Sequence, residues 1–222
     1  MSKATLTSPD QAPQEAPQPS LWRNVMNKYI RPAVVMTLLL TILTGLIYPG
    51  VVTAIAQVVF PYQANGSLHY VNGKLVGSDL IGQYWTLARY FHGRPSVTVS
   101  AATGSPEPYA ADNSTASNLG PTSKALIQQV QQRIAALKKE NPNAPPGPVP
   151  VDLVTASGSG LDPDITIAAA LYQVPRVAAA RGLSQSRVQQ LVMDNVTGRF
   201  LGIFGEPYVN VLQLNLALDA LK

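Results

Sequence analysis

A stretch of 42 residues, from position 32 to position 73, contains no aspartate, glutamate, lysine or arginine. Ala33 to Phe60 is almost entirely apolar, and as a helix this segment would be about 42 Å long, more than the roughly 30 Å hydrocarbon core of a bilayer. A buried helix of a soluble protein is rarely so long. The sequence therefore predicts a membrane helix over residues 32–60, with a kink at Pro49-Gly50.

Flanking charge predicts the orientation of this helix. The ten positions before it hold three basic residues, Arg23, Lys28 and Arg31, whereas Lys74 is the only one in the eighteen positions that follow Phe60. Basic residues favour the cytoplasmic side. We expect residues 1–31 in the cytoplasm and residues 61–222 in the periplasm, with the helix in the inner membrane.

The N-terminal part raises a second possibility. We expect residues 1–31 to form a disordered tail with a basic end, because residues 1–20 hold four prolines among small and polar residues and a basic segment follows them. Ala54-Ile55-Ala56 resembles a signal-peptidase site, and cleavage there would release the outer domain. The long tail and the apolar residues that continue to Phe60 favour a retained helix.

Small or polar residues recur every four positions along the predicted helix. They are Thr37, Thr41, Gly45, Pro49 and Thr53, followed by Gln57. Such a stripe lets another helix approach closely, which favours a partner helix in the membrane. Threonine and glycine are also common in membrane helices that have no partner, so the alternative stays open.

Residues 61–222 are enough for one compact domain, which we expect to be α/β (α+β). The patterns predict a hairpin at 68–76 around Asn72-Gly73, helices at 121–140 and 166–181, a further helix after Ser184, and a strand at 208–212 followed by a helix. They also predict a strand at 149–155. Pro175 should kink the second helix, and Gly182 should end it.

Composition leaves few routes to catalysis. The chain has no cysteine and only two histidines, and its basic residues form no cluster typical of nucleic-acid binding. The loop Ser157-Gly158-Ser159-Gly160 could be a nucleophile elbow or a phosphate cradle, but it lacks the order G-x-S-x-G and has no Lys-Ser or Lys-Thr after it. Asp162 and Asp164 begin a calcium-loop pattern that does not continue. A tight turn followed by a helix cap is the simpler interpretation.

Several motifs, in order, resemble one family. They lie at residues 61–68, 77–83, 90–96 (Tyr-Phe-His-Gly-Arg-Pro-Ser), 117–120, 149–163, 173–181 and 209–219. In these stretches the chain is similar to the C subunit of the Kdp-type potassium-transporting ATPase. The resemblance implies one retained membrane helix, an outer domain, no metal and no catalytic residue in this chain.

The resemblance also implies partners and a role. A channel-like subunit would carry potassium, a P-type ATPase subunit would use the ATP, and this chain would be needed for assembly and would raise the ATP affinity of the catalytic subunit. Gln173 and the loop at Ser157, Gly158, Ser159 and Gly160 are weak candidates for nucleotide contact. The remaining family-motif candidates are Gly82, Gln83, Phe91, Gly93, Arg94, Pro95, Ser96, Ser117, Asn118, Asp162, Arg176, Asn210 and Asn215.

Two other classes remain open at this point. A membrane-anchored periplasmic serine hydrolase would use Ser157 or Ser159 together with His69 or His92. A membrane-anchored solute-binding module would gain thermal stability when its ligand is added.

Overall fold

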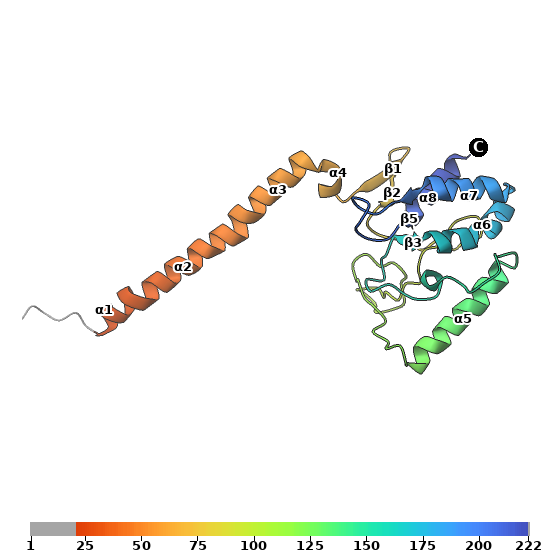
Figure 1. The fold of residues 1–222 in the computed structure, drawn as a ribbon. Coiled ribbons are helices and arrows are strands. Elements are labelled where there is room, and N and C mark those ends of the chain that lie inside the picture. The colour runs from red at the N-terminus through yellow and green to blue at the C-terminus, as the bar shows by residue number, and fades with distance from the viewer. Residues whose placement is uncertain (1–20, 222) are drawn as a thin grey trace, which may run out of the picture. The chain divides into compact units, whose positions relative to one another are not determined.

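The computed structural model describes residues 21–221, and the tail predicted for residues 1–20 lies outside them (Figure 1). The chain divides into two compact units, with the boundary after Pro61. Each unit is described by itself.

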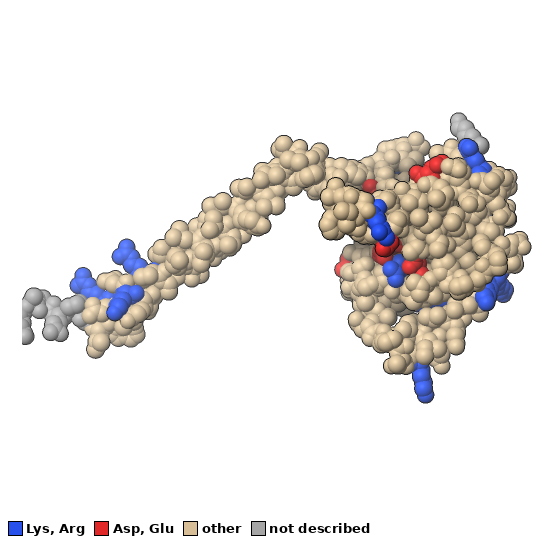
Figure 2. All heavy atoms as spheres, viewed as in Figure 1, with Lys and Arg blue, Asp and Glu red and all other residues tan. Residues whose placement is uncertain are grey.

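The first unit is a long apolar helix. It consists of α1 (Leu21–Val25), a π turn (Met26–Ile30), α2 (Arg31–Ile42), a second π turn (Leu43–Ile47) and α3 (Tyr48–Val59). Together these form 39 helical residues, long and apolar enough to cross a membrane. Residues 21–31, which the sequence analysis placed in the tail, belong to this helix. Figure 2 shows basic side chains at its N-terminal end and no charged side chain along the rest.

Each π turn lies just before a proline. Pro49 has no N–H to donate, and its ring crowds the carbonyl four residues earlier, at Gly45. A π turn over Leu43–Ile47 changes the local hydrogen bonding, and the helix continues through Pro49. The kink expected at Pro49-Gly50 stays a prediction; the structure has a π turn that ends two positions before Pro49.

The second unit begins with the predicted hairpin. After the short helix α4 (Pro61–Ala64), strands β1 (Leu68–Val71) and β2 (Lys74–Ser78) pair in antiparallel fashion. Asn72 and Gly73 both have positive φ, at 51° and 75°. Those angles match a type I′ turn, which Asn-Gly favours. The hairpin prediction is confirmed.

The rest of the domain combines helices with a small sheet. Strands β3 (Asp164–Thr166), β5 (Tyr208–Asn210) and β4 (Val196–Thr197) form an antiparallel sheet in the order β3-β5-β4. Helices α6 (Ile167–Arg181) and α7 (Gln185–Asp194) lie between β3 and β4 in the chain, and α8 (Val211–Ala220) follows β5. The N-cap side chains Thr166, Ser184 and Asn210 each accept a hydrogen bond from the N–H three residues later. Gly182 ends α6 at φ 66°.

The expected helix at 121–140 is α5 (Lys124–Glu140). The expected strand at 149–155 is wrong, because this segment contains a 3₁₀ turn, Val151–Leu153. Pro150 has no N–H for a strand ladder, and the Asp152 carboxylate accepts a hydrogen bond from the N–H of Thr166, 2.8 Å away. That contact holds the segment against the end of β3.

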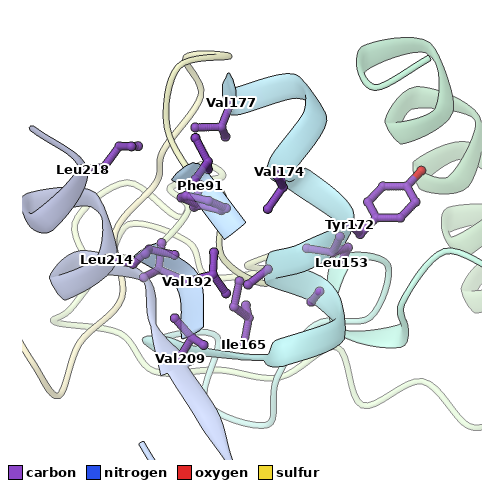
Figure 3. Packing of buried hydrophobic residues seen from close by; sticks show 14 of the residues in the cluster. Phe91, Leu153, Ile165, Tyr172, Val174, Val177, Val192, Val209, Leu214 and Leu218 are labelled. Atoms are coloured by element: carbon purple, nitrogen blue, oxygen red, sulfur yellow. The ribbon is translucent and has the colours of Figure 1, made fainter. Parts of the chain in front are cut away.

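The core lies among the helices and the sheet (Figure 3). Phe91, from an irregular segment, is fully buried between side chains of α6, α7 and α8, among them Val177, Val192 and Leu214. Pro175 lies within α6 and is buried there. Because Phe91 comes from outside the regular elements, the core also fixes the path of the chain around residues 85–98.

Candidate functional site: a buried polar network

Two buried amide side chains hold the backbone of Phe91 and His92. Asn215 of α8 accepts from the N–H of Phe91 (2.8 Å) and donates to its carbonyl (2.9 Å). Gln173 of α6 does the same for His92, at 2.8 and 3.0 Å. Both side chains are almost inaccessible to solvent, at 0 and 2% exposed. We call this pair of side chains the amide clamp; it ties an irregular segment to two helices, and both the oxygen and the nitrogen of each amide are hydrogen-bonded.

Arg176 extends the clamp. Its guanidinium donates to the carbonyls of Ala88 (2.7 Å) and Tyr90 (3.0 Å) and to Oε1 of Gln173 (2.7 Å). Its Nε lies 3.4 Å from Oε1 of Glu140, at the end of α5. Burial lowers the pKa of Arg176 below its usual value, and the charge of Glu140 opposes that change.

His92 lies beside this guanidinium. Its Nδ1 is 3.4 Å from Oε1 of Glu140, and its Nε2 is 3.1 Å from the carbonyl of Leu87. Burial lowers the pKa of His92, and the positive charge of Arg176 lowers it further. A neutral imidazole is therefore favoured at neutral pH.

A second set of contacts surrounds Arg94. Its NH1 lies 3.0 Å from the Asp162 carboxylate, and its carbonyl accepts from the hydroxyl of Tyr109 at 2.7 Å. Tyr109 packs closely against Gly93, where a Cβ would lie 2.6 Å from the tyrosine hydroxyl. At Gly82 a Cβ would lie 2.6 Å from the carbonyl oxygen of Asp162. Glycine at these two positions is required by close packing.

The loop from Ser157 to Gly160 is closed on itself and docked on a neighbouring segment. The hydroxyl of Ser157 accepts from the N–H of Gly160 (2.9 Å), and the carbonyl of Gly160 accepts from the hydroxyl of Ser96 (2.7 Å). Gly160 has φ +70°, and a Cβ there would lie 2.7 Å from the carbonyl of Thr115. The loop has the geometry of a tight structural turn.

Asp79 and Asp164 line a hollow of about 450 Å³ together with Tyr62, Tyr208 and Asn210, among others. Asn210 donates to Oδ1 of Asp164 (3.0 Å) and to the carbonyl of Asp79 (2.9 Å). Burial, together with the charges of Asp162 and Asp79, raises the pKa of Asp164 to about 6 against the opposing effect of the hydrogen bond from Asn210. Burial raises the pKa of Asp79, but hydrogen bonds, of which the one from Gln213 has the largest effect, hold it below its usual value.

The raised pKa of Asp164 predicts a pH dependence of stability. The pKa of Asp164 in the unfolded chain is about 4, so between pH 4 and about 6 the folded state binds more protons than the unfolded state. The contribution of this group to stability is therefore fully present below pH 4 and is lost as the pH rises through 6. Urea denaturation of the full chain and of Asp164→Asn at pH 4 and pH 7 checks this. The stability of the unmodified chain should fall relative to the variant, and equal changes would contradict the prediction.

A second hollow, of about 340 Å³, lies beside the clamp. Gln83, Trp85, Arg94, Pro95 and Glu140 contribute to its walls. Nε1 of Trp85 and Nε of Arg94 are buried without a hydrogen-bond partner. Gln83 itself donates to the carbonyl of Val76, which places it between this hollow and β2.

The serine and histidine residues considered for a hydrolase have other partners. The hydroxyl of Ser157 accepts a hydrogen bond from the N–H of Gly160, and the hydroxyl of Ser159 accepts one from the N–H of Leu161. His69 lies 2.6 Å from Asp79 in a separate cluster. Among the described residues, no group of three histidine, aspartate or glutamate side chains is placed to hold a metal ion.

The structure brings most of the candidate residues together, but not all. Ser117 and Asn118 are exposed, and Asn118 donates only to the nearby carbonyl of Ala116. The small-residue stripe lies on the helix of the first unit, where a Cβ on Gly45 would meet nothing within 4 Å. Glu140 and Tyr109 were not among the candidates, although they contact Arg176 and Arg94. No local pattern marks them, because these partners are distant in the sequence.

Comparisons with known proteins agree with the motif order. The model of the family described as K+-transporting ATPase, c chain, matches residues 30–220. The chain is 58% identical over 202 residues to the potassium-transporting ATPase KdpC subunit of Rhodopseudomonas palustris strain BisB18, across 89% of this chain and 100% of that protein. The subunit of the same name from Methylobacterium nodulans is 55% identical over 201 residues (88% and 98%), and that from Bradyrhizobium diazoefficiens is 56% identical over 200 (87% and 98%). The chain belongs to the KdpC family, the c chain of the K+-transporting ATPase.

Proposed function

We propose that this chain is a non-catalytic accessory subunit of an ATP-driven potassium uptake pump, needed to assemble it. The observation that carries the proposal is the match to the c-chain family over residues 30–220. Its partners are a channel-like subunit that carries potassium and a P-type subunit that hydrolyses ATP. The long apolar helix, with lipid around it, supplies the membrane attachment.

The proposed topology has residues 1–31 in the cytoplasm, the membrane helix over 32–60 and the outer domain over 61–222 in the periplasm. The basic residues Arg23, Lys28 and Arg31 support it, because they precede the apolar segment. Any effect on ATP affinity must then act across the membrane, since ATP is used on the cytoplasmic side. We propose that the subunit raises this affinity indirectly, by stabilising the assembled pump.

The hydrogen bonding of the nucleotide candidates supports the indirect route. All four hydrogen-bonding positions of Gln173 are used inside the domain, on His92, Ala169 and Arg176. The turn at Ser157–Gly160 directs the hydroxyl of Ser157 to its own backbone. We assign these residues to the stability of the outer domain.

We propose that the membrane-helix interface is the stripe of Thr37, Thr41, Gly45, Pro49 and Thr53. Gly45→Leu should then reduce co-purification of the other pump subunits with a tagged form of this chain, and the remaining complex should have a higher KM for ATP. The reason is that a bulky side chain blocks close helix approach. Pull-down from detergent-solubilised membranes, followed by ATPase kinetics, measures both effects.

Gly50→Leu is the matched control. Gly50 lies about 140° around the helix from Gly45 at about 100° per residue, and a Cβ there also meets nothing within 4 Å. It should leave co-purification unchanged. Equal recovery of the pump subunits with both variants would refute the stripe as an interface.

A further inference from the structure

The connection between β4 and β5 exposes an unusual number of large apolar side chains. Phe200, Leu201, Ile203 and Phe204 are 71, 73, 73 and 61% exposed. Within residues 62–221 no other stretch of five has as many large apolar residues so exposed. We call residues 198–205 the apolar loop. Exposed apolar patches of this kind mark surfaces that bind a protein, a membrane or an apolar ligand.

The backbone of the apolar loop is largely paired within itself. The N–H of Phe200 and the carbonyl of Phe204, and the reverse pair, lie 2.9 Å apart. The N–H groups of Gly202 and Ile203 bond to the carbonyls of Arg199 and Phe200, at 3.0 and 3.1 Å. Each peptide group that is hydrogen-bonded within the loop lowers the free-energy cost of moving the loop from water into an apolar phase. Four of the six N–H groups of residues 200–205 are thus paired within the loop.

Charge is confined to the neck of the loop. NH2 of Arg199 lies 2.9 and 2.7 Å from the two carboxylate oxygens of Glu206. Residues 200–205 carry no charged side chain. An apolar tip above a polar, paired neck is the pattern of segments that lie in the interface of a bilayer.

The base of the loop lies close to the first residues of the second unit. Thr197 and Tyr208, which pair across the base, line the same hollow as Tyr62 and Gln63. Tyr62 is two residues beyond Phe60, hence within about 8 Å of it along the chain. The hollow thus brings the loop base next to the first residues of the second unit, which follow the apolar segment directly in the chain.

We propose that the apolar loop inserts its four side chains into the headgroup region of the lipid bilayer that holds the chain's own helix. A covalent tether brings the base of the loop to that interface, and phenylalanine, leucine and isoleucine partition there. The loop is then a second membrane attachment, which limits rotation of the outer domain about its tether. The inference needs the membrane helix but not the proposed role in pump assembly.

The absence of cysteine makes a depth measurement straightforward. Leu201→Cys and Ile203→Cys each provide one site for a nitroxide label in the full chain. The labelled chain is assembled with its pump subunits and placed in liposomes of phosphatidylethanolamine and phosphatidylglycerol. Ile127→Cys is the control, because Ile127 is an exposed apolar residue (47%) on α5 that lines none of the hollows described.

Collisions of the label with oxygen, which concentrates in lipid, are compared with collisions with a water-soluble nickel chelate. Labels at 201 and 203 should meet oxygen more than nickel, and the label at 127 should show the reverse. A label at 201 as accessible to nickel as the control would place the loop in water and overturn the proposal. Shielding from both reagents would mean that a protein subunit covers the loop, which also overturns it.

Discussion

Gln173→Ala is expected to lower the free energy of unfolding of the outer domain by about 3 kcal/mol or more, because each buried group left without a partner costs about 1–3 kcal/mol. The substitution removes partners from both peptide groups of His92 and from the guanidinium of Arg176. No water can replace them easily at a side chain that is 2% exposed. The network also loses its connection between α6 and the segment that carries Phe91.

Urea denaturation of the full chain in detergent micelles measures this loss. A Trp22→Phe background leaves Trp85 of the outer domain as the single tryptophan and reporter. Gln190→Ala is the matched control, because Gln190 is exposed on α7 and bonds only to Asp194, four residues later. It should change stability by less than about 0.5 kcal/mol.

The same variant separates a structural from a nucleotide-binding role. If Gln173 contacted ATP, Gln173→Ala would leave the domain as stable as the control and raise the KM of the assembled pump for ATP. That outcome would contradict the assignment made from the hydrogen bonds. A loss of stability in the isolated chain, without nucleotide present, supports it.

Arg176→Met should have an effect of similar size, about 3–5 kcal/mol, because it removes a buried charged donor that satisfies several acceptors at once. The carbonyls of Ala88 and Tyr90 would lose this donor, and Oε1 of Gln173 would keep only the N–H of His92. Methionine keeps much of the volume, so the loss reports hydrogen bonding more than packing. Thermal and urea denaturation of the full chain provide the measurement.

A second readout follows from His92. The charge of Arg176 lowers the pKa of this histidine, so in Arg176→Met its pKa should rise. The chain has only two histidines, and His69 serves as the internal reference in an NMR titration. Arg187→Met, on the exposed surface of α7, should change neither stability nor this pKa. An unchanged pKa of His92 in the first variant would contradict the network as described.

Substituting both partners tests their coupling. Gln173 and Arg176 are joined by a 2.7 Å hydrogen bond, so their effects should not add. The double variant should lose less stability than the sum of the two single losses, because the second substitution removes groups that the first has already left unpaired. Strict additivity would mean that the two side chains act independently.

Local patterns predicted much of the fold. The charge-free segment indicated the long helix, Asn72-Gly73 indicated the hairpin turn, and Thr166 and Gly182 marked the two ends of α6. These features depend on neighbours within a few residues, so sequence spacing is sufficient to find them. The strand expected at 149–155 failed because Asp152 bonds to Thr166, fourteen residues away, and no local pattern reports such a contact.

For the candidate residues, too, the sequence predicted some features and distant contacts decided others. The motif order selected Gln173, Arg176 and Asn215, but their task, holding the backbone of residues 88–92, could not be derived from sequence because the partners are 81 to 124 positions apart. Glu140 and Tyr109 were missed for the same reason. Phe200, Leu201, Ile203 and Phe204 between glycines were a visible signal, yet only their exposure distinguishes them from a core segment.

By itself, the sequence indicated an apolar helix long enough to cross a membrane, a cysteine-free domain after it and the family, because hydropathy, composition and motif order are properties of the linear chain. Only the tertiary structure decided that Gln173, Arg176 and Asn215 hold an irregular segment in place. Buried amides and charges must find partners wherever the fold brings them. Which partners those are depends on contacts between distant segments, and these exist only once the chain has folded.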